Sequence, residues 1–161
     1  LGTGSGAIAL ALASERPSWT LVAVDSQPTA VALAISNRDR LGLCNVEILQ
    51  SDWFATVSGH FDLIVSNPPY IDPADPHLQQ GDVRHEPHSA LVAQAGGLAD
   101  LAHIIALAVD YLTPQGVLIV EHGADQGEAV RSFFAAGSYE TANTLRDLSG
   151  LERVTLSHKA P

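Results

Sequence analysis

The sequence predicts an α/β domain with a mostly parallel sheet and helices on both faces. Short runs rich in aliphatic and β-branched residues alternate with helical segments, which is the order expected of βαβ units. A glycine-rich stretch, residues 2–6, stands directly before the first helical segment, where folds of this class bind nucleotide-like ligands. The chain has 161 residues, 46% of them hydrophobic and 16% charged, as expected of one globular domain.

Short buried-looking runs are expected to form the strands of this sheet. They are residues 20–25, 46–50, 61–66, 117–121, 139–145 and 153–157. A further strand is expected upstream of Leu1, because the glycine-rich stretch needs a strand in front of it. The predicted architecture is therefore a Rossmann-like sheet of seven strands whose first strand is truncated in this chain.

Helices are expected in the segments between these strands. Pro28 suits a helix start and Gly42 suits a helix stop. The predicted helices are residues 7–14, 28–41, 98–112 and 126–136. Residues 71–97 are expected to be a loop, since prolines and glycines interrupt any periodic pattern there, and loops of that length are usually lids or binding loops.

Charge and cysteine content exclude several classes of function. Eighteen acidic residues against eight basic ones give a formal charge of −10, which repels phosphate backbones and argues against direct nucleic-acid binding. Cys44 is the single cysteine, so no internal disulfide is possible. No apolar run approaches the roughly 20 residues that span a bilayer. We therefore expect a cytoplasmic protein without a membrane partner.

The glycine-rich stretch is the first part of a predicted cofactor site. Its residues, Gly2, Thr3, Gly4, Ser5 and Gly6, let the backbone approach a ligand closely, and the helix that follows turns its first N–H groups toward that ligand. Taken alone the pattern is ambiguous. With Ala7 it also fits the permissive dinucleotide-binding form G-x-G-x-x-G/A, and it fits an ordinary tight turn.

Acidic and aromatic residues at the next two strand ends extend the cofactor site. Asp25 lies nineteen positions after Gly6, close to the spacing of about 20 at which a carboxylate accepts hydrogen bonds from ribose hydroxyls. Asp52 can accept from the exocyclic amine of an adenine, and Trp53 can border its ring. The alternatives are a solvated carboxylate for Asp25 and ordinary core packing for Trp53.

The tetrapeptide Asn67-Pro68-Pro69-Tyr70 predicts the reacting centre. The Asn67 side-chain carbonyl and the Pro68 backbone carbonyl can accept the two N–H bonds of a substrate NH2 group and aim its nitrogen at a methyl sulfonium. Pro68 and Pro69 remove backbone donors, and Tyr70 can stack on the planar group. A simple Pro-Pro turn after a buried strand is the alternative. Asn67, Pro68 and Tyr70 are thus the candidate catalytic residues.

Histidines do not predict a metal centre in this chain. His77, His85 and His88 lie in a segment rich in proline and glycine, without the H-x-x-x-H spacing of a helical zinc site and without a cysteine pair. We therefore expect no metal.

The order and spacing of these motifs resemble a known class of enzymes. The glycine stretch, Asp25 and the tetrapeptide are similar to those of class I S-adenosylmethionine-dependent methyltransferases. Within that class, residues 77–87 (His77-Leu78-Gln79-Gln80-Gly81-Asp82-Val83-Arg84-His85-Glu86-Pro87) and residues 152–156 (Glu152-Arg153-Val154-Thr155-Leu156) resemble the HemK/PrmC family, the peptide chain release factor glutamine methyltransferases.

This resemblance implies a reaction, a cofactor and a partner. The reaction is N5-methylation of the glutamine in the Gly-Gly-Gln motif of release factors, with S-adenosylmethionine as cofactor. Residues 2–6, Asp25, Trp53 and Asn67 would contact the cofactor, and residues 67–70 would grip the glutamine amide. Residues 1–161 would be the catalytic domain. The helical N-terminal domain of the family, and the aspartate that usually precedes its Leu-Gly pair, are absent from this chain.

The sequence leaves other functions open, both enzymatic and non-catalytic. A ribosomal-protein glutamine methyltransferase or an adenine-N6 methyltransferase shares the tetrapeptide, although the acidic charge argues against a nucleic-acid substrate. A non-catalytic binding module on the same fold is the second alternative.

Overall fold

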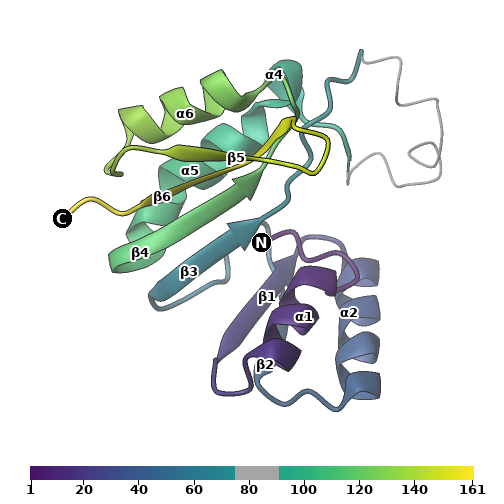
Figure 1. Cartoon of the computed structure of the whole chain (residues 1–161). Coiled ribbons are helices and arrows are strands. Elements are labelled where there is room, and N and C mark those ends of the chain that lie inside the picture. Colours follow the sequence, from purple (N-terminus) through teal and green to yellow (C-terminus); the bar gives the residue numbers. More distant parts are fainter. Residues whose placement is uncertain (75–90) are drawn as a thin grey trace. The chain divides into compact units, whose positions relative to one another are not determined.

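The structure is a computed structural model that describes residues 1–74 and 91–161 (Figure 1). The chain forms two compact units, Leu1–Ser58 and Gly59–Pro161. None of the helices among the described residues is long and apolar enough to cross a membrane.

The first unit contains two αβ pairs. Helix α1 (Ala7–Glu15) precedes strand β1 (Leu21–Asp25), and helix α2 (Pro28–Leu41) precedes strand β2 (Val46–Gln50). The two strands pair in parallel, so that Asp25 and Gln50 lie side by side at their carboxyl ends. This parallel arrangement brings the residues that follow both strands to one edge of the sheet.

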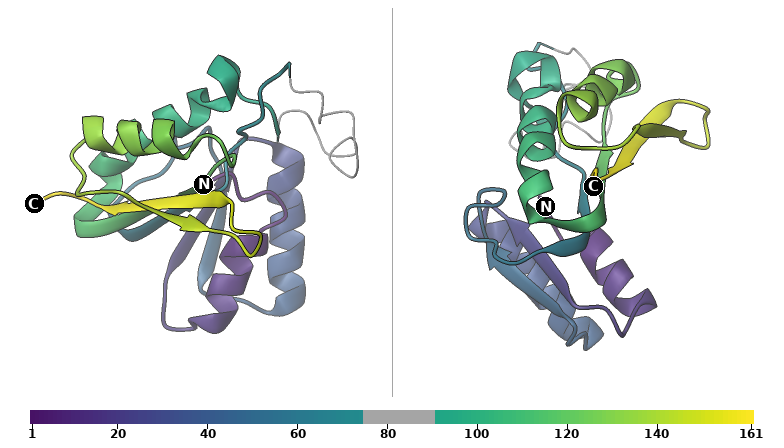
Figure 2. Two further views of the ribbon diagram at one scale, coloured as in Figure 1. Left: turned by 45° about the horizontal axis from the view of Figure 1, so that its top comes forward. Right: turned by 90° about the vertical axis from the view of Figure 1, so that its left-hand side faces the viewer.

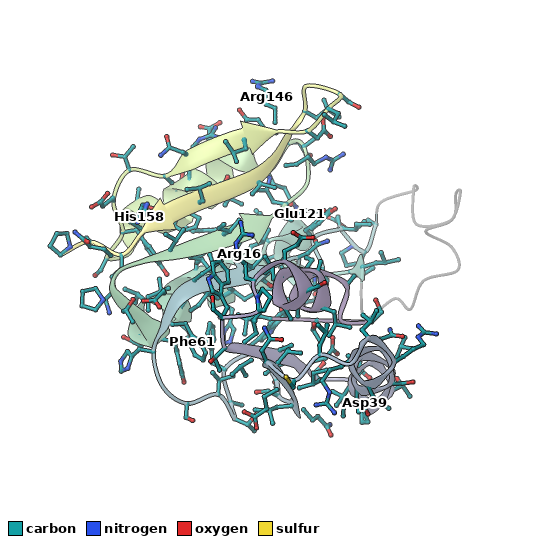
Figure 3. All side chains as sticks on the ribbon, turned by 60° about the horizontal axis from the view of Figure 1, so that its bottom comes forward. Arg16, Asp39, Phe61, Glu121, Arg146 and His158 are labelled. Atoms are coloured by element: carbon teal, nitrogen blue, oxygen red, sulfur yellow. The ribbon has the colours of Figure 1, made fainter. Side chains whose placement is uncertain are left out.

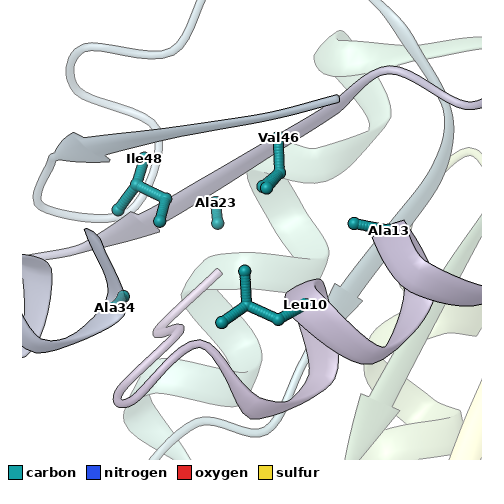
Figure 4. Close-up of a cluster of buried hydrophobic side chains, with 6 residues drawn as sticks. All are labelled: Leu10, Ala13, Ala23, Ala34, Val46 and Ile48. Carbon is teal, nitrogen blue, oxygen red and sulfur yellow. The ribbon is translucent and has the colours of Figure 1, made fainter. Parts of the chain in front are cut away.

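A small aliphatic core holds the first unit together. Figure 4 shows the side chain of Leu10, from α1, directed toward the strands. The other buried members of this cluster are Ala13, Ala23, Ala34, Val46 and Ile48. Gly6 begins α1 with φ 86°, and a Cβ on Gly6 would lie 2.9 Å from Leu10 Cδ1 and 3.3 Å from the Ala34 Cβ. Only glycine therefore lets the loop enter α1 so close to α2.

The second unit is a four-stranded sheet with helices packed against it. Its strand order is β3-β4-β6-β5, with β3 and β4 parallel and with β6 antiparallel to both β4 and β5. Helices α5 and α6 pack against each other and against β4 and β6 (Figures 1 and 2). The elements are β3 (Phe61–Ser66), α4 (Gln94–Gly97), α5 (Ala99–Tyr111), β4 (Leu112–Glu121), α6 (Gly127–Ala136), β5 (Asn143–Arg146) and β6 (Glu152–His158).

The second unit has the larger apolar core. Fully buried apolar side chains of α5, β4 and α6 form much of it, and they include Leu101, Ile104, Leu118, Val130 and Phe134. The Phe134 ring meets the Tyr139 ring edge to face, with 5.0 Å between centroids. Burial raises the pKa of Tyr139, whose hydroxyl donates to the Ile105 carbonyl at 2.7 Å. The buried phenol is therefore satisfied by the backbone of α5.

Replacing Phe134 by alanine should destabilise the second unit by about 3–5 kcal/mol, because the change leaves a cavity and removes the aromatic contact with Tyr139. The measurement is the free energy of unfolding from urea titration. Leu148→Ala, at a fully exposed side chain, is the control and should change that free energy by less than about 0.5 kcal/mol. Equal effects of the two changes would contradict this description of the core.

The predicted α/β class and most element bounds are confirmed. Helix α2 and strands β2 and β3 have the predicted limits. The predicted loop over residues 71–97 is wrong at its ends, because Ile71 forms a bridge with Val92 and residues 94–97 form the single turn α4. The positive φ angles of Ala95 and Gly96 make that turn irregular, and no sequence periodicity marks it. Residues 75–90 lie outside the described part.

The last strands differ from the sequence prediction in extent and direction. Strand β4 starts at Leu112 rather than at residue 117, and β5 starts at Asn143, with Tyr139 in an isolated bridge to Lys159. The Lys159 ammonium donates to the Val109 and Leu112 carbonyls, which satisfies the end of α5. The antiparallel direction of β5 and β6 leaves no mark on the hydrophobic pattern of either strand.

Candidate functional site

The glycine loop of the first unit is a preorganised turn at the carboxyl end of β1. The Thr3 N–H donates to the Val24 carbonyl at 2.8 Å, and the Gly6 N–H donates to the Thr3 carbonyl at 2.8 Å. The Asn37 side chain donates to the Ser5 carbonyl at 2.9 Å, which ties the loop to α2. A Cβ at Gly4 would have no atom within 4 Å, so this glycine borders open space.

Asp25 joins the glycine loop to the turn that follows β1. Its Oδ2 atom accepts the Gly4 N–H at 2.8 Å, and its Oδ1 atom accepts the Gln27 N–H at 2.9 Å. An ionised carboxylate has about four lone-pair sites, so two hydrogen bonds leave capacity for further donors. Asp25 can therefore hold the loop and still accept from a ligand hydroxyl.

Trp53 lies against the glycine loop. A Cβ built on Gly2 would be 3.4 Å from the Trp53 Cζ3 atom, so the indole covers this glycine closely. Trp53 has φ 46°, a left-handed backbone that is uncommon for an aromatic residue and that clusters at ligand sites. The neighbouring Asp52 is exposed, and Ser51 is buried with its Oγ accepting the Thr56 N–H. The first unit thus brings the glycine loop, Asp25 and Trp53 together.

The predicted tetrapeptide follows β3 in the second unit. Asn67 is exposed, Pro68 is fully buried, and Pro69 and Tyr70 are half-buried. Of the two predicted hydrogen-bond acceptors, the Asn67 amide is therefore the one at the surface. Both prolines have φ fixed by their rings, so the segment is stiff.

Tyr70 is held by residues that the sequence did not single out. Its hydroxyl donates to Glu121 Oε1 at 3.1 Å, and its backbone carbonyl accepts Gln126 Nε2 at 2.9 Å. Figure 3 labels Glu121 at the end of β4. Glu121 could have been predicted from its position in the sequence, because it is a carboxylate at the carboxyl end of a predicted parallel strand, as Asp25 is.

A groove of about 390 Å³ lies beside Tyr70. Besides Tyr70 it is lined by Glu121 and by four residues of the β5–β6 hairpin, namely Arg146, Asp147, Arg153 and Val154. Neighbouring Glu152 accepts from Arg131 at 2.9 Å, and this hydrogen bond, with the nearby Arg131 and Arg146 charges, lowers the pKa of Glu152.

Acid should weaken the hairpin that borders this groove. The folded-state pKa of Glu152 lies below its ordinary value of 4.5, so its stabilising effect is complete above about pH 4.5 and is lost as the pH falls through the folded-state pKa. Urea unfolding of the wild type should therefore show a loss of stability below about pH 4.5 that is smaller in Glu152→Gln. Glu47→Gln, at an exposed position on β2, is the matched control, and an identical acid loss in Glu152→Gln and the control would contradict the assignment.

Metal ligation finds no support in the described part of the chain, where no group of three or more His, Cys, Asp or Glu side chains could hold an ion. His77, His85 and His88 lie outside the described residues, as do residues 77–87 with Arg84 and Glu86. Cys44 is exposed on the first unit.

The fold places the chain in a broad class of proteins. A crystal structure of a methyltransferase from Pyrococcus furiosus matches 99% of the chain and 73% of its own length with a TM-score of 0.74, at 17% sequence identity. The shared fold is that of the class I methyltransferases. The chain belongs to the methyltransferase small domain family, whose model matches residues 1–135.

Curated relatives resemble the chain much more closely in sequence. The release factor glutamine methyltransferase of Salmonella typhimurium is 59% identical over 100% of the chain. That of Escherichia coli is 57% identical over 97% of the chain. The chain spans 58% and 57% of the length of these two relatives.

Proposed function

We propose that the chain carries the catalytic site of a protein-glutamine methyltransferase. It would move a methyl group from S-adenosylmethionine to the side-chain amide nitrogen (N5) of the glutamine in the Gly-Gly-Gln motif of release factors. The proposal of this substrate is supported by sequence identity to the two release factor glutamine methyltransferases. The identity is 59% and 57%, over 100% and 97% of the chain.

The first unit fits the proposed cofactor. S-adenosylmethionine supplies an electrophilic methyl group on a sulfonium. The open side of Gly4 leaves room for a ligand at the loop, and the spare lone pairs of Asp25 suit ribose hydroxyls. The Trp53 indole beside Gly2 offers an apolar surface for an adenine, and the exposed Asp52 can accept from its amine. Thr3, Ser5 and Gly6 shape the turn itself.

The second unit fits the proposed substrate. The exposed Asn67 amide oxygen accepts an N–H of the glutamine amide and fixes its plane, so that the weak nitrogen lone pair is aimed at the methyl group. As that nitrogen becomes positive, the same hydrogen bond strengthens. Tyr70, whose ring is held by Glu121, supplies a flat surface for the amide, and Pro68 and Pro69 keep the segment stiff. The same proposal has Asn67 also contact the cofactor and has the Pro68 carbonyl accept the second N–H of the substrate amide.

Methyl transfer to a side-chain amide needs no strong general base. An amide nitrogen is scarcely basic before attack, and the proton it carries becomes acidic only once the methyl group has been added. As the N–C bond forms, the S–C bond would break, S-adenosylhomocysteine would leave as a neutral thioether, and the released proton would pass to water. Orientation and electrostatic stabilisation therefore provide the rate enhancement.

Release factors are thus the proposed protein partner. Because release factors act in translation termination, the proposed location is the cytoplasm. The formal charge of −10 argues against direct binding of nucleic acid. A ribosomal-protein glutamine methyltransferase, an adenine-N6 methyltransferase and a non-catalytic binding module are the competing possibilities, and the substrate comparison below separates them.

The test is a comparison of substrates. The full-length protein is incubated with S-adenosylmethionine labelled in the methyl group and, in separate reactions, with release factor, ribosomal protein and DNA. We expect label on release factor alone. Label on ribosomal protein or DNA but not on release factor would identify one of the competing enzymes, and no transfer to any of the three would favour the binding module.

A further inference from the structure

Gln126 is a buried side chain whose amide joins three segments of the second unit. Its Nε2 atom donates to the carbonyls of Tyr70 at 2.9 Å and Gly96 at 3.3 Å. Its Oε1 atom accepts the Gly123 N–H at 2.8 Å. Only 9% of the residue is exposed. Because carbonyls only accept and an N–H only donates, this network fixes which end of the amide faces which segment.

Gly97 closes the arrangement around the Tyr70 carbonyl. It has φ +80°, and a Cβ on it would overlap the Tyr70 carbonyl oxygen and lie 2.8 Å from Gln126 Nε2. The Gly97 backbone thus packs directly on the hydrogen bond between Gln126 and Tyr70, which leaves the carbonyl little room to move.

Tyr70 is consequently held at both ends. Glu121 holds the ring through the hydroxyl, and Gln126 holds the peptide group through the carbonyl. The residues between Tyr70 and Asn67 are two prolines whose rings fix φ, so the segment that joins the Tyr70 peptide to Asn67 has fewer free torsion angles than an ordinary tetrapeptide.

We propose that Gln126 is a positioning residue for methyl transfer, which acts through the Tyr70 carbonyl to keep the tetrapeptide in its productive position. This inference rests on the proposed function. Gln126 lies on the segment that leads into α6 and donates to the tetrapeptide at Tyr70 O, so we expect its effect on the rate of transfer rather than on cofactor affinity.

A merely structural role for Gln126 would depend on a different hydrogen bond. The Gly123 N–H bond to Oε1 and the Gln126 N–H bond to the Gly123 carbonyl shape the turn before α6. Gln126→Glu keeps the acceptor for Gly123 and, in its ionised form, removes the donor for Tyr70. Gln126→Met removes both at nearly the same side-chain length. The two variants therefore separate positioning from turn formation.

The experiment uses the full-length protein with release factor and S-adenosylmethionine. Gln126→Glu should lower kcat by about 10-fold or more, as expected for a reacting group displaced by a fraction of an ångström, with KM for the cofactor changed by less than about twofold. Gln115→Glu makes the same charge change at an exposed position and should keep the wild-type kcat. A wild-type kcat in Gln126→Glu, with loss only in Gln126→Met, would overturn the inference in favour of a turn-forming role.

A second measurement remains decisive if Gln126→Glu folds poorly. In an Asn67→Ala background, Gln126→Met should lower kcat much less than in the wild type, because the amide that Gln126 is proposed to keep in position is already absent. Multiplicative effects in the double variant would overturn the inference.

Failure of the inference can be told from failure of the proposed function. With fluorotyrosine incorporated, the Tyr70 resonance, identified by its loss in Tyr70→Phe, should shift in Gln126→Glu and stay in place in Gln115→Glu. This readout needs no substrate. A wild type that leaves release factor unmethylated contradicts the proposed function, whereas an unshifted Tyr70 resonance in Gln126→Glu contradicts the role of Gln126.

Discussion

Asn67→Ala should lower the rate of methyl transfer by on the order of 10²-fold or more, because it removes a polar contact that strengthens as charge develops on the substrate nitrogen. The loss should appear in kcat at saturating release factor and cofactor. Asn67 is exposed at the end of β3, so the change leaves no buried group unsatisfied and should not unfold the second unit.

Asn143→Ala is the matched control for this experiment. Asn143 is an exposed asparagine on β5, and its side chain donates only a long hydrogen bond of 3.4 Å to the Thr141 carbonyl. The control should methylate release factor at the wild-type rate. An undiminished rate in Asn67→Ala would show that the amide does not orient the substrate.

Asp25→Ala should weaken S-adenosylmethionine binding by about 10²-fold. The change removes the carboxylate that is proposed to accept hydrogen bonds from the ligand, and it also leaves the Gly4 N–H without its partner. Calorimetric titration of the full-length protein with the cofactor measures the effect. Asp39→Ala, which breaks an exposed ion pair with Arg38 on the same unit, should bind the cofactor as the wild type does.

The two parts of Asp25 can be separated by a milder change. Asp25→Asn keeps one oxygen that can accept either the Gly4 N–H or a ligand hydroxyl, and removes the charge. Its affinity should fall between those of the wild type and Asp25→Ala. Wild-type affinity in Asp25→Ala would exclude a part for this carboxylate in the cofactor site.

Local signals in the sequence were sufficient for much of the first unit. Pro28 and Gly42 mark the two ends of α2, because one suits the first helical position and the other takes the left-handed cap at φ 67°. Asp25 ends a buried parallel strand, so predicting that strand was enough to predict that Asp25 lies at the edge of the sheet.

The residues that support Tyr70 were beyond such signals. Glu121 and Gln126 lie 51 and 56 positions from Tyr70 in the chain, and only the folding of β4 and α6 brings them to it. The turn at residues 94–97 depends on left-handed backbone angles at Ala95, Gly96 and Gly97, and Gly97 packs against the Tyr70 carbonyl. The assignment of residues 1–161 to one catalytic domain, and the individual roles of the site residues, remain predictions.

The most direct test of the account is to locate the transferred methyl group by tandem mass spectrometry of release factor treated with the full-length protein and S-adenosylmethionine. We expect one added methyl group on the side-chain amide of the glutamine in the Gly-Gly-Gln motif, and its loss when Asn67→Ala replaces the wild type. A methyl group on any other residue, or an unmodified glutamine after complete consumption of cofactor, would contradict it.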